Sequence, residues 1–265
     1  MNLASNGRAP DIAEQQLSLL MRELGNIAGI TIDSSPGVIG GHVRERMDYL
    51  GLDNVDSYMA LFDSSISARA EWLALTDLLT IKETRFFRQP AAYDCLAGYF
   101  EQMLDAAPAT GDISLWSAGC STGQELYSMA MVADAVIARG CPWLDWSGYG
   151  SDISFRALAR SREAVYSARD RECVPERYRE QFLDPKLGDR CKVVEHIRAR
   201  THFFHGNLLH VDSAPYADFN VIFCQNVLIY FARDKQRWII DQLVERLRPG
   251  GLLVLGAGED VSWRN

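Results

Sequence analysis

The stretch from Ile113 to Tyr127 constrains the fold of this 265-residue chain more than any other. It opens with apolar residues typical of a buried strand and passes through small residues at 117–123. Apolar side chains then recur at three- and four-residue steps from Leu126 to Ile137, which is helical spacing. In many α/β sheets a strand, a small-residue turn and a helix form a cofactor-binding site, because the backbone can come close to the ligand and the helix N-terminus faces it. An ordinary strand-to-helix connection is equally compatible, because the Gly-x-Gly-x-x-Gly spacing is absent.

The second half of the chain alternates predicted strands with predicted helices. Strands are expected over residues 146–151, 201–205, 219–224 and 252–256, and helices over 154–164 and 234–247. This alternation predicts an α/β fold with a doubly wound, mostly parallel, Rossmann-like sheet that binds ligands at its carboxyl edge. The segment 166–200 is too long and charge-rich for a simple connection, so we expect a small inserted subdomain there.

The first third of the chain has helical patterns and no strand pattern. Four helices are expected between residues 11 and 80, which would form a small all-helical N-terminal domain. Arg44 and Arg46 are expected on the solvated outer side of the second helix, although a docking face is an alternative. Residues 81–110 are predicted to be a linker and a leading helix, and residues 111–265 the main domain.

Composition and charge exclude several classes of function. The net charge of −8 argues against a nucleic-acid partner, because such binding depends on basic side chains. The six cysteines form no Cys-x-x-Cys pair, which favours free thiols in a reducing cytosol. No apolar run approaches ~18 residues, so we expect a cytoplasmic protein without membrane insertion. The five histidines lack metal-site spacing, and no metal is expected.

Polar residues stand at the ends of the predicted strands, where ligands bind in such sheets. Asp152 follows the second strand and could accept hydrogen bonds from ribose hydroxyls; its alternative role is a helix N-cap, for which Ser154 is better suited. Asn207 follows the third strand and could bond an adenine edge or ribose, or simply form a turn. The fourth strand is followed by side chains that could frame a reacting group or begin a packed helix: Gln225, Asn226 and Tyr230.

Five segments in order combine these features: Glu83-Thr84-Arg85-Phe86-Phe87-Arg88, residues 116–128, Ser151-Asp152-Ile153, Asn207-Leu208-Leu209 and residues 223–231. With these segments the chain resembles the CheR-type chemoreceptor protein-glutamate O-methyltransferases, a branch of the class I S-adenosylmethionine-dependent methyltransferases. The resemblance covers nearly the whole chain, including the helical first third.

The resemblance implies methyl transfer from S-adenosyl-L-methionine, which leaves S-adenosyl-L-homocysteine, to glutamate carboxylates in the cytoplasmic domain of a methyl-accepting chemoreceptor. The product would be a methyl ester used for adaptation in chemosensory signalling. A glutamate is already ionised at neutral pH, so no general base is required. The implied catalytic residues are Arg88, which would steer the acceptor carboxylate, and Tyr230, which would face it.

The resemblance also implies a set of cofactor-binding residues. Thr84 and Arg88 would reach the methionine end of the cofactor, and Glu125 its amino-acid part. Asp152 would contact the ribose. The full implied set is Lys82, Thr84, Arg88, Ala118, Glu125, Asp152, Asn207, Leu208, Gln225 and Asn226, with Asn207 and Leu208 at the adenine.

The chain departs from the family pattern at three places, and two alternative functions stay open. The family usually has Asn at the position of Lys82, Glu-Glu-Pro at Gln124-Glu125-Leu126 and Arg at the position of Gln225. A non-catalytic S-adenosylmethionine-binding regulator of a signalling array is one alternative, which Lys82 and Gln225 favour. A class I methyltransferase acting on another acceptor, such as an amine, is the other. The receptor, its methylated glutamates and any grip of the 166–200 insertion on a receptor tail are not readable from the sequence.

The last predicted strand is followed by too few residues for the antiparallel hairpin that usually closes a class I methyltransferase sheet. We therefore expect the natural chain to continue past Asn265. We expect the present form to be less stable or more self-associating, because an apolar edge strand is open to pairing. Otherwise a monomer is expected, recruited to receptor arrays through the receptor.

Overall fold

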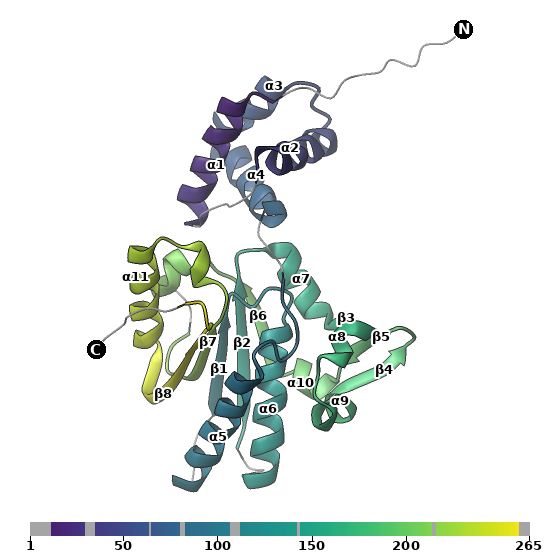
Figure 1. Cartoon of the computed structure of the whole chain (residues 1–265), viewed down its shortest axis with the longest axis vertical. Helices are drawn as coiled ribbons and strands as arrows, with labels where there is room; N and C mark the ends of the chain where they lie inside the picture. Colours follow the sequence, from purple (N-terminus) through teal and green to yellow (C-terminus); the bar gives the residue numbers. More distant parts are fainter. Residues whose placement is uncertain are drawn as a thin grey trace. The chain divides into compact units, whose positions relative to one another are not determined.

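The computed structural model describes residues 12–29, 35–63, 65–79, 83–106, 112–141, 144–213 and 216–259. The chain divides into two units, Met1–Ile81 and Lys82–Asn265, and each is described by itself (Figure 1). Among the described helices, none is long and apolar enough to cross a membrane.

Every regular element that the structure describes in the first unit is a helix. Its helix α2 begins with a proline at the first helical position and ends at Leu50, and the capping Gly51 adopts a left-handed conformation with φ 68°. Leu20, Val43 and Tyr58 are fully buried in its core. Its elements are α1 (Glu14–Ala28), α2 (Pro36–Leu50), α3 (Val55–Met59), the 3-10 helix η1 (Ala60–Asp63) and α4 (Ser65–Leu79).

A buried ion pair ties three of these helices together. Arg46 of α2 donates to both carboxylate oxygens of Glu71 of α4, at 2.9 and 2.8 Å. The Tyr58 hydroxyl of α3 donates to the same carboxylate at 2.7 Å. The expectation that Arg46 lies on a solvated face is therefore wrong, because its side chain is only 18% exposed. The helical period alone could not show that a buried acid from another helix meets this arginine.

The second unit contains a five-stranded sheet in the order β6-β2-β1-β7-β8, and every pairing in it is parallel. The strand order reverses at β1, which makes its carboxyl end the topological switch point. The predicted doubly wound parallel sheet is thus confirmed. The strands are β1 (Ile113–Ala118), β2 (Trp146–Asp152), β6 (Thr201–His205), β7 (Phe219–Cys224) and β8 (Leu247–Leu255).

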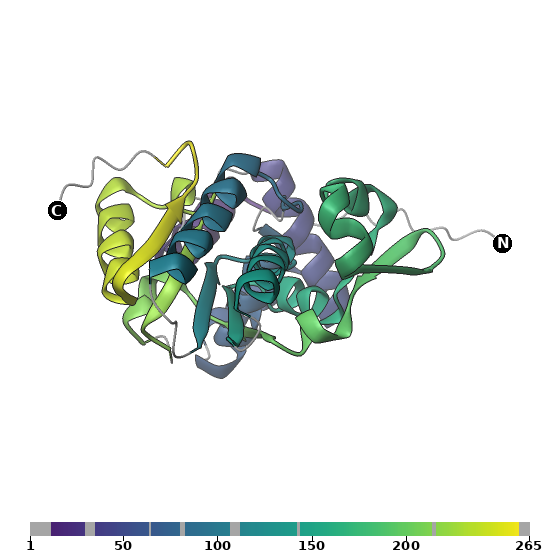
Figure 2. The ribbon, with the colours of Figure 1, turned by 90° about the horizontal axis from the view of Figure 1, so that it is seen from below.

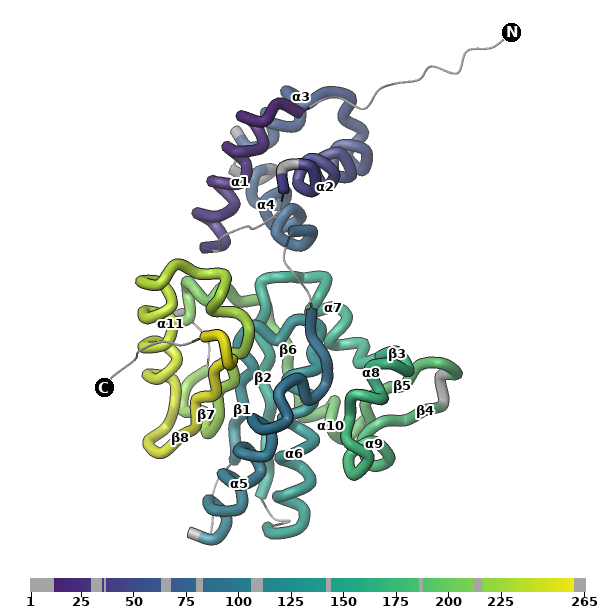
Figure 3. The backbone as a smooth tube through the Cα atoms, in the orientation of Figure 1, coloured from purple at the N-terminus to yellow at the C-terminus, as the bar shows by residue number. Residues whose placement is uncertain are grey.

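Helices α5 (Pro90–Ala106) and α6 (Gln124–Gly140) pack against each other and cover one face of this sheet (Figure 2). Leu115, Val132 and Phe223 are fully buried in the resulting core. Helix α7 (Phe155–Glu163) contacts β2 and β6, and α11 (Arg233–Glu245) contacts β8 and the 3-10 helix η2 (Leu208–Ser213). The chain path in Figure 3 shows β7 and β8 side by side, so the segments that follow them leave the same edge of the sheet.

A small antiparallel sheet is inserted between α7 and β6, in the order β3-β5-β4. Figure 2 shows it to one side of the central sheet. The amide of Val193 donates to the carbonyl of Ala164 at 3.0 Å, so the two ends of the insertion lie close together. Its elements are β3 (Val165–Ser167), α8 (Ala168–Glu172), α9 (Glu176–Phe182), β4 (Leu183–Leu187), β5 (Arg190–Val193) and α10 (Glu195–Arg198).

The last strand is longer than predicted. It begins at Leu247 rather than 252, and α11 ends at Glu245. Leu247 pairs with Phe219, and the register then shifts before Leu252 pairs with Val221. This irregularity accommodates Gly250, whose φ of 78° suits glycine and interrupts a regular strand.

Candidate functional site

The turn after β1 is built for close approach. Gly119 has φ 85°, and a Cβ at this position would lie 2.5 Å from Cγ2 of Val227. The amides of Gly119 and Cys120 both donate to the carbonyl of Ser151, which draws the turn toward the end of β2. Ser121 also adopts a positive φ, 49°, and its buried hydroxyl oxygen has no hydrogen-bond partner. A buried polar atom without a partner in the protein is a place where a ligand can bond.

Asp152 joins the turn after β1 to the turn after β2. Its Oδ2 accepts from the Ser121 amide and its Oδ1 from the Ser154 amide, each at 2.8 Å. Ser154 caps α7 through its own hydroxyl, which accepts from the Ala157 amide at 3.0 Å. The cap is therefore Ser154, as the sequence favours, and Asp152 stands at the carboxyl edge of the sheet. Its contact with a ribose stays a prediction.

Asn207 forms a turn in this structure. Its side-chain oxygen accepts from the Leu209 amide at 2.9 Å, and the His210 amide donates to its carbonyl at 2.8 Å. Leu208 is buried at the start of η2, and Ala118 is fully buried at the end of β1. All three lie just after or at the carboxyl ends of strands, where the sequence places them, but a contact with adenine is not tested by this geometry.

Glu125 lies in the first turn of α6 and accepts a hydrogen bond from the Ser117 hydroxyl at 2.7 Å. Burial raises the pKa of this carboxyl from 4.5 to about 8. The Ser117 hydrogen bond opposes the rise, the carboxylate of Glu259 adds to it, and the guanidinium of Arg88 opposes it. A cation that arrived beside Glu125 would favour its ionised form. An ionised Glu125 could accept hydrogen bonds from an ammonium group or attract a sulfonium by its charge.

The segment that carries Arg88 is fixed to α6. The amide of Phe87 donates to the Ser128 hydroxyl at 3.0 Å, and the Phe87 ring stacks on Tyr178 with centroids 5.2 Å apart. Arg88 donates to the carbonyl of Glu83 at 2.8 Å. Thr84 is partly buried in this segment. Lys82 lies outside the described residues.

The loop between β7 and α11 carries the remaining predicted residues. The Gln225 amide nitrogen donates to the side-chain oxygen of Gln89 at 3.0 Å, which links this loop to the Arg88 segment. Asn226 adopts a left-handed conformation with φ 60°, and its side-chain oxygen is buried without a hydrogen-bond partner. The side-chain oxygens of Asn226 and Ser121 are thus both buried without a partner at the same edge of the sheet.

Tyr230 ends the short 3-10 helix η3 (Leu228–Tyr230) in this loop. Burial raises the pKa of its phenol, Arg88 opposes the rise, and Glu83 and Glu259 add to it. Arg88 therefore acts electrostatically on both Glu125 and Tyr230. Arg88, Tyr230 and Glu125, whose site roles stay predictions, thus influence one another through their charges.

The buried thiols near this cluster are unreactive. Burial raises the pKa of Cys120 and of Cys224 well above the ordinary thiol value, and nearby carboxylates raise both further. Both side chains stay protonated at neutral pH and are poor nucleophiles. In the part of the chain that the structure describes, no three His, Cys, Asp or Glu side chains are grouped for a metal ion.

Sequence reasoning missed Glu259 as a site residue. It is only 5% exposed and follows β8 at the same sheet edge as Gln225. A signal is present in the sequence, because Asp152, Asn207 and Gln225 are each predicted from their place after a strand. Glu259 is the corresponding residue after the last strand. Ser117 and Gln89, which bond Glu125 and Gln225, carry no such signal.

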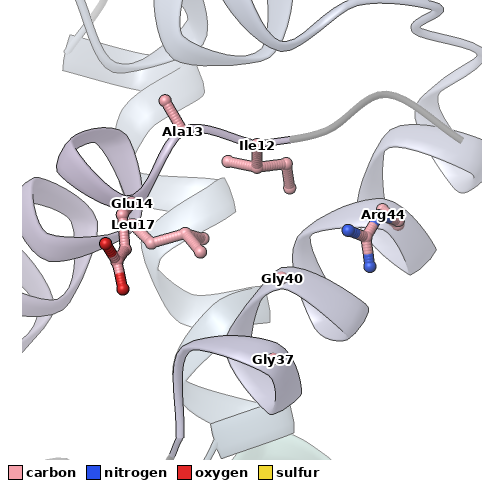
Figure 4. Close-up of a pocket in the computed structure, with 7 residues that line it drawn as sticks. All are labelled: Ile12, Ala13, Glu14, Leu17, Gly37, Gly40 and Arg44. Carbon is pink, nitrogen blue, oxygen red and sulfur yellow. The ribbon is translucent and has the colours of Figure 1, made fainter.

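A separate hollow of about 560 Å³ lies in the helical unit (Figure 4). Ile12, Leu17 and Arg44 are among its lining residues, together with the turns of α2 at Gly37 and Gly40. It contains none of the predicted site residues.

The sequence matches a family model and several methyltransferases. Residues 82–265 match the family model described as CheR methyltransferase, SAM binding domain. The chain is similar to a chemotaxis protein methyltransferase of Klebsiella aerogenes, with 32% identity that covers 94% of this chain and 86% of that protein. Chemotaxis protein methyltransferase 1 of Vibrio cholerae is 33% identical over 95% of this chain and 91% of its own length. The probable biofilm formation methyltransferase WspC of Pseudomonas aeruginosa is 30% identical over 84% of this chain and 51% of its own length.

Proposed function

Because the chain belongs to the CheR methyltransferase family, we propose that it transfers a methyl group from S-adenosylmethionine to glutamate carboxylates of a chemoreceptor. The reaction would take place at the carboxyl edge of the five-stranded sheet and give methyl esters. The observation that carries the assignment of the site is a cluster of groups at the carboxyl edge of the sheet. The buried oxygens of Ser121 and Asn226 have no partner there, and the Gly119 turn meets Val227. Arg88 adds a positive charge that acts on both Glu125 and Tyr230. One side of this cluster is suited to a cationic cofactor and the other to an anionic acceptor.

The residues at this edge fit S-adenosylmethionine. When bound, the cofactor supplies an electrophilic methyl group on a positively charged sulfur. Glu125 offers a desolvated carboxylate to a cation, and the buried oxygens of Ser121 and Asn226 offer free acceptor capacity. The absence of a side chain at Gly119 keeps the turn tight against Val227. The proposed binding set also includes Thr84, Ala118, Asp152, Asn207, Leu208 and Gln225.

The acceptor side needs orientation rather than proton transfer. A glutamate carboxylate with an ordinary pKa near ~4.3 is already ionised and nucleophilic at neutral pH. The protein must hold it in line with the methyl carbon and remove water from it. Arg88 is a half-buried cation that can steer the carboxylate, and Tyr230 can donate a hydrogen bond to it. An incomplete ion pair suits this role, because a tight ground-state pair would slow the reaction.

Two alternatives differ from this proposal, one in the use of the cofactor and the other in the acceptor. A non-catalytic regulator would bind it without turnover, but Arg88, Glu125 and Tyr230 are all present and grouped. Gln225, which stands where the family usually has Arg, still has a partner in this loop, because its amide nitrogen donates to Gln89. A methyltransferase for another acceptor is the second alternative, and an amine acceptor would need a general base. An Asp/Asn-Pro-Pro-Tyr turn after the fourth strand would also favour such an acceptor, and Asn226-Val227-Leu228-Ile229 lacks the prolines.

The partner that we propose is the cytoplasmic domain of a methyl-accepting chemoreceptor. The enzyme would act in the cytoplasm as a monomer and reach receptor arrays by binding the receptor. The fraction of methylating activity that co-sediments with receptor-containing membranes would test this recruitment.

The decisive experiment is transfer of a radiolabelled methyl group from S-adenosylmethionine to purified receptor cytoplasmic domains. Base-labile label on the receptor is the expected result, because esters hydrolyse in base and methylated amines do not. Arg88→Ala should lower kcat about 100-fold, the scale of a misplaced reacting group. Arg237→Ala is the control, since Arg237 is an exposed arginine of α11. Base-stable label would indicate another acceptor, and cofactor binding without label would indicate a regulator.

A further inference from the structure

The carboxylate of Glu259 gathers three backbone amides at the carboxyl edge of the sheet. Its Oε1 accepts from the amides of Val227 and Leu228, each at 2.6 Å, and its Oε2 accepts from the Gly256 amide at 2.6 Å. The side chain is almost completely buried. One acidic residue after β8 therefore holds the beginning of the loop that follows β7.

This loop carries two of the proposed site residues. Asn226 immediately precedes the two amides that Glu259 holds, and Tyr230 follows them within the same turn. The Tyr230 amide donates to the carbonyl of Val227 at 3.2 Å, so the position of Tyr230 depends on that of Val227. The side chain of Gln236 donates to the carbonyls of Leu228 and Phe231, at 2.9 and 2.8 Å. Glu259 satisfies amides of the loop, and Gln236 satisfies its carbonyls.

The surroundings allow the carboxylate little freedom. A Cβ at Gly256 would lie 2.6 Å from Oε2 of Glu259 and 2.8 Å from the amide nitrogen of Asn226. On the other side of the loop, Val227 packs against Gly119 of the turn after β1. The loop is thus clamped between the glycine turn and the Glu259 carboxylate, and both contacts involve Val227.

The arrangement requires acceptors at both oxygens of the side chain. A carboxylate can accept on both and makes stronger bonds to amides because it is charged. A glutamine has one acceptor oxygen, so its amide nitrogen would face either a loop amide or the Gly256 amide, donor against donor. The charge of Glu259 is also felt at the site, where it raises the pKa of Glu125 and of Tyr230.

We propose that Glu259 is a positioning residue for methyl transfer: its carboxylate holds the backbone of Val227 and Leu228 so that Asn226 and Tyr230 face the reacting groups. This role rests on the proposed function of the site. The same negative charge helps the site to prefer a cationic cofactor over the uncharged sulfur of the product. Glu259 itself needs no contact with cofactor or acceptor.

The test compares Glu259→Gln and Glu259→Ala with Asn220→Ala. Asn220 is also buried and bonds a backbone amide, that of Ser114 at 2.9 Å, but at the opposite end of β7. Each variant is measured for kcat and KM on a receptor cytoplasmic domain, for thermal melting, and for binding of S-adenosylmethionine and S-adenosylhomocysteine by calorimetry.

Glu259→Gln should lower kcat about 10- to 100-fold, because a small displacement of Tyr230 misaligns the acceptor, with a smaller change in KM. It should also lower the ratio of S-adenosylmethionine to S-adenosylhomocysteine affinity roughly 3- to 10-fold, since a nearby unit charge is lost. Asn220→Ala should lower the melting temperature and leave kcat and this ratio near the parent values.

The proposal is overturned if Glu259→Gln melts at a lower temperature but keeps the parent kcat and the parent affinity ratio, because Glu259 would then be structural only. If Glu259→Ala does not fold, Glu259→Gln still decides. Failure of the parent chain to methylate any receptor would count against the proposed acceptor instead. In that case the affinity ratio, measured without turnover, still tests Glu259.

Discussion

Each unit of the molecule holds a desolvated glutamate, and the two are treated in opposite ways. Glu71 in the helical unit receives three donated hydrogen bonds, two from a guanidinium and one from a phenol. Glu125 in the second unit receives one from Ser117, and its pKa is raised to about 8. A carboxylate whose charge the protein itself compensates holds helices together. One whose charge the protein compensates only in part is suited to a cation that binds later.

The largest effect that separates the two glutamates is on stability. Glu71→Ala leaves the mostly buried Arg46 without its partner, so the free energy of unfolding should fall by about 3–5 kcal/mol. Urea denaturation measures it. Glu23→Ala is the control, because Glu23 pairs with Arg22 at the surface and should change stability by less than ~1 kcal/mol. Equal effects of the two substitutions would show that the buried pair is not a stabilising tie.

The next effect is on cofactor binding. Glu125→Gln should weaken the binding of S-adenosylmethionine by about 1.5–3 kcal/mol, the worth of a charged hydrogen bond, and should not destabilise the fold at pH 8. Calorimetric titration and thermal melting measure the two quantities. Glu101→Gln removes an exposed charge from the neighbouring α5 and should leave both unchanged. A Glu125 variant that melts early but binds normally would make Glu125 resemble Glu71 and remove the contrast.

The contrast also has a pH signature. The folded pKa of Glu125 is about 8 and its ordinary value is 4.5, so ionisation costs more in the folded chain than in the unfolded chain. The contribution of Glu125 to stability is thus fully present below its unfolded pKa and is lost as the pH rises toward its folded pKa. Glu125→Gln should flatten the fall in melting temperature across this range. At neutral pH, cofactor binding should release roughly one proton from Glu125, detected as a dependence of binding heat on the buffer.

The smallest effect compares two tyrosines. Tyr58→Phe removes one hydrogen bond to Glu71 and should lower stability by about 1 kcal/mol, without changing cofactor affinity. Tyr230→Phe should leave stability unchanged and lower kcat on the receptor. Denaturation curves and turnover numbers for both variants make the comparison. If Tyr58→Phe lowered kcat, or Tyr230→Phe lowered stability without changing kcat, the assignment of Tyr58 to structure and of Tyr230 to the reaction would be contradicted.

The sequence predicts the sheet well and the side-chain partners poorly, for a physical reason. Strand and helix periods are local, so the alternation after Ile113 and the cap at Ser154 can be read directly. Arg46 has the same helical spacing whether it faces water or a buried acid, and the acid is 25 residues away. Only the packed structure shows the pair.

In the candidate site too, the positions of the residues can be predicted from the sequence but their partners cannot. Asp152, Asn207 and Gln225 were recognisable because each follows a strand of the sheet. That Asp152 accepts from the Ser121 amide depends on β1 and β2 lying side by side, which no local pattern contains. Glu259 also follows a strand, but its partners are backbone amides of residues 227, 228 and 256, which no side-chain pattern identifies.

The contact between Gly119 and Val227 has a consequence for how such a site can change over generations. The turn after β1 and the loop after β7 are separated by about a hundred residues of chain, yet a single methyl group at Gly119 would overlap Val227. A larger residue at 119 should therefore be strongly selected against. A smaller residue at 227 would remove the overlap but not the strain of a φ of 85° on a residue other than glycine. A selection for altered acceptors should therefore keep Gly119 and randomise the loop after β7.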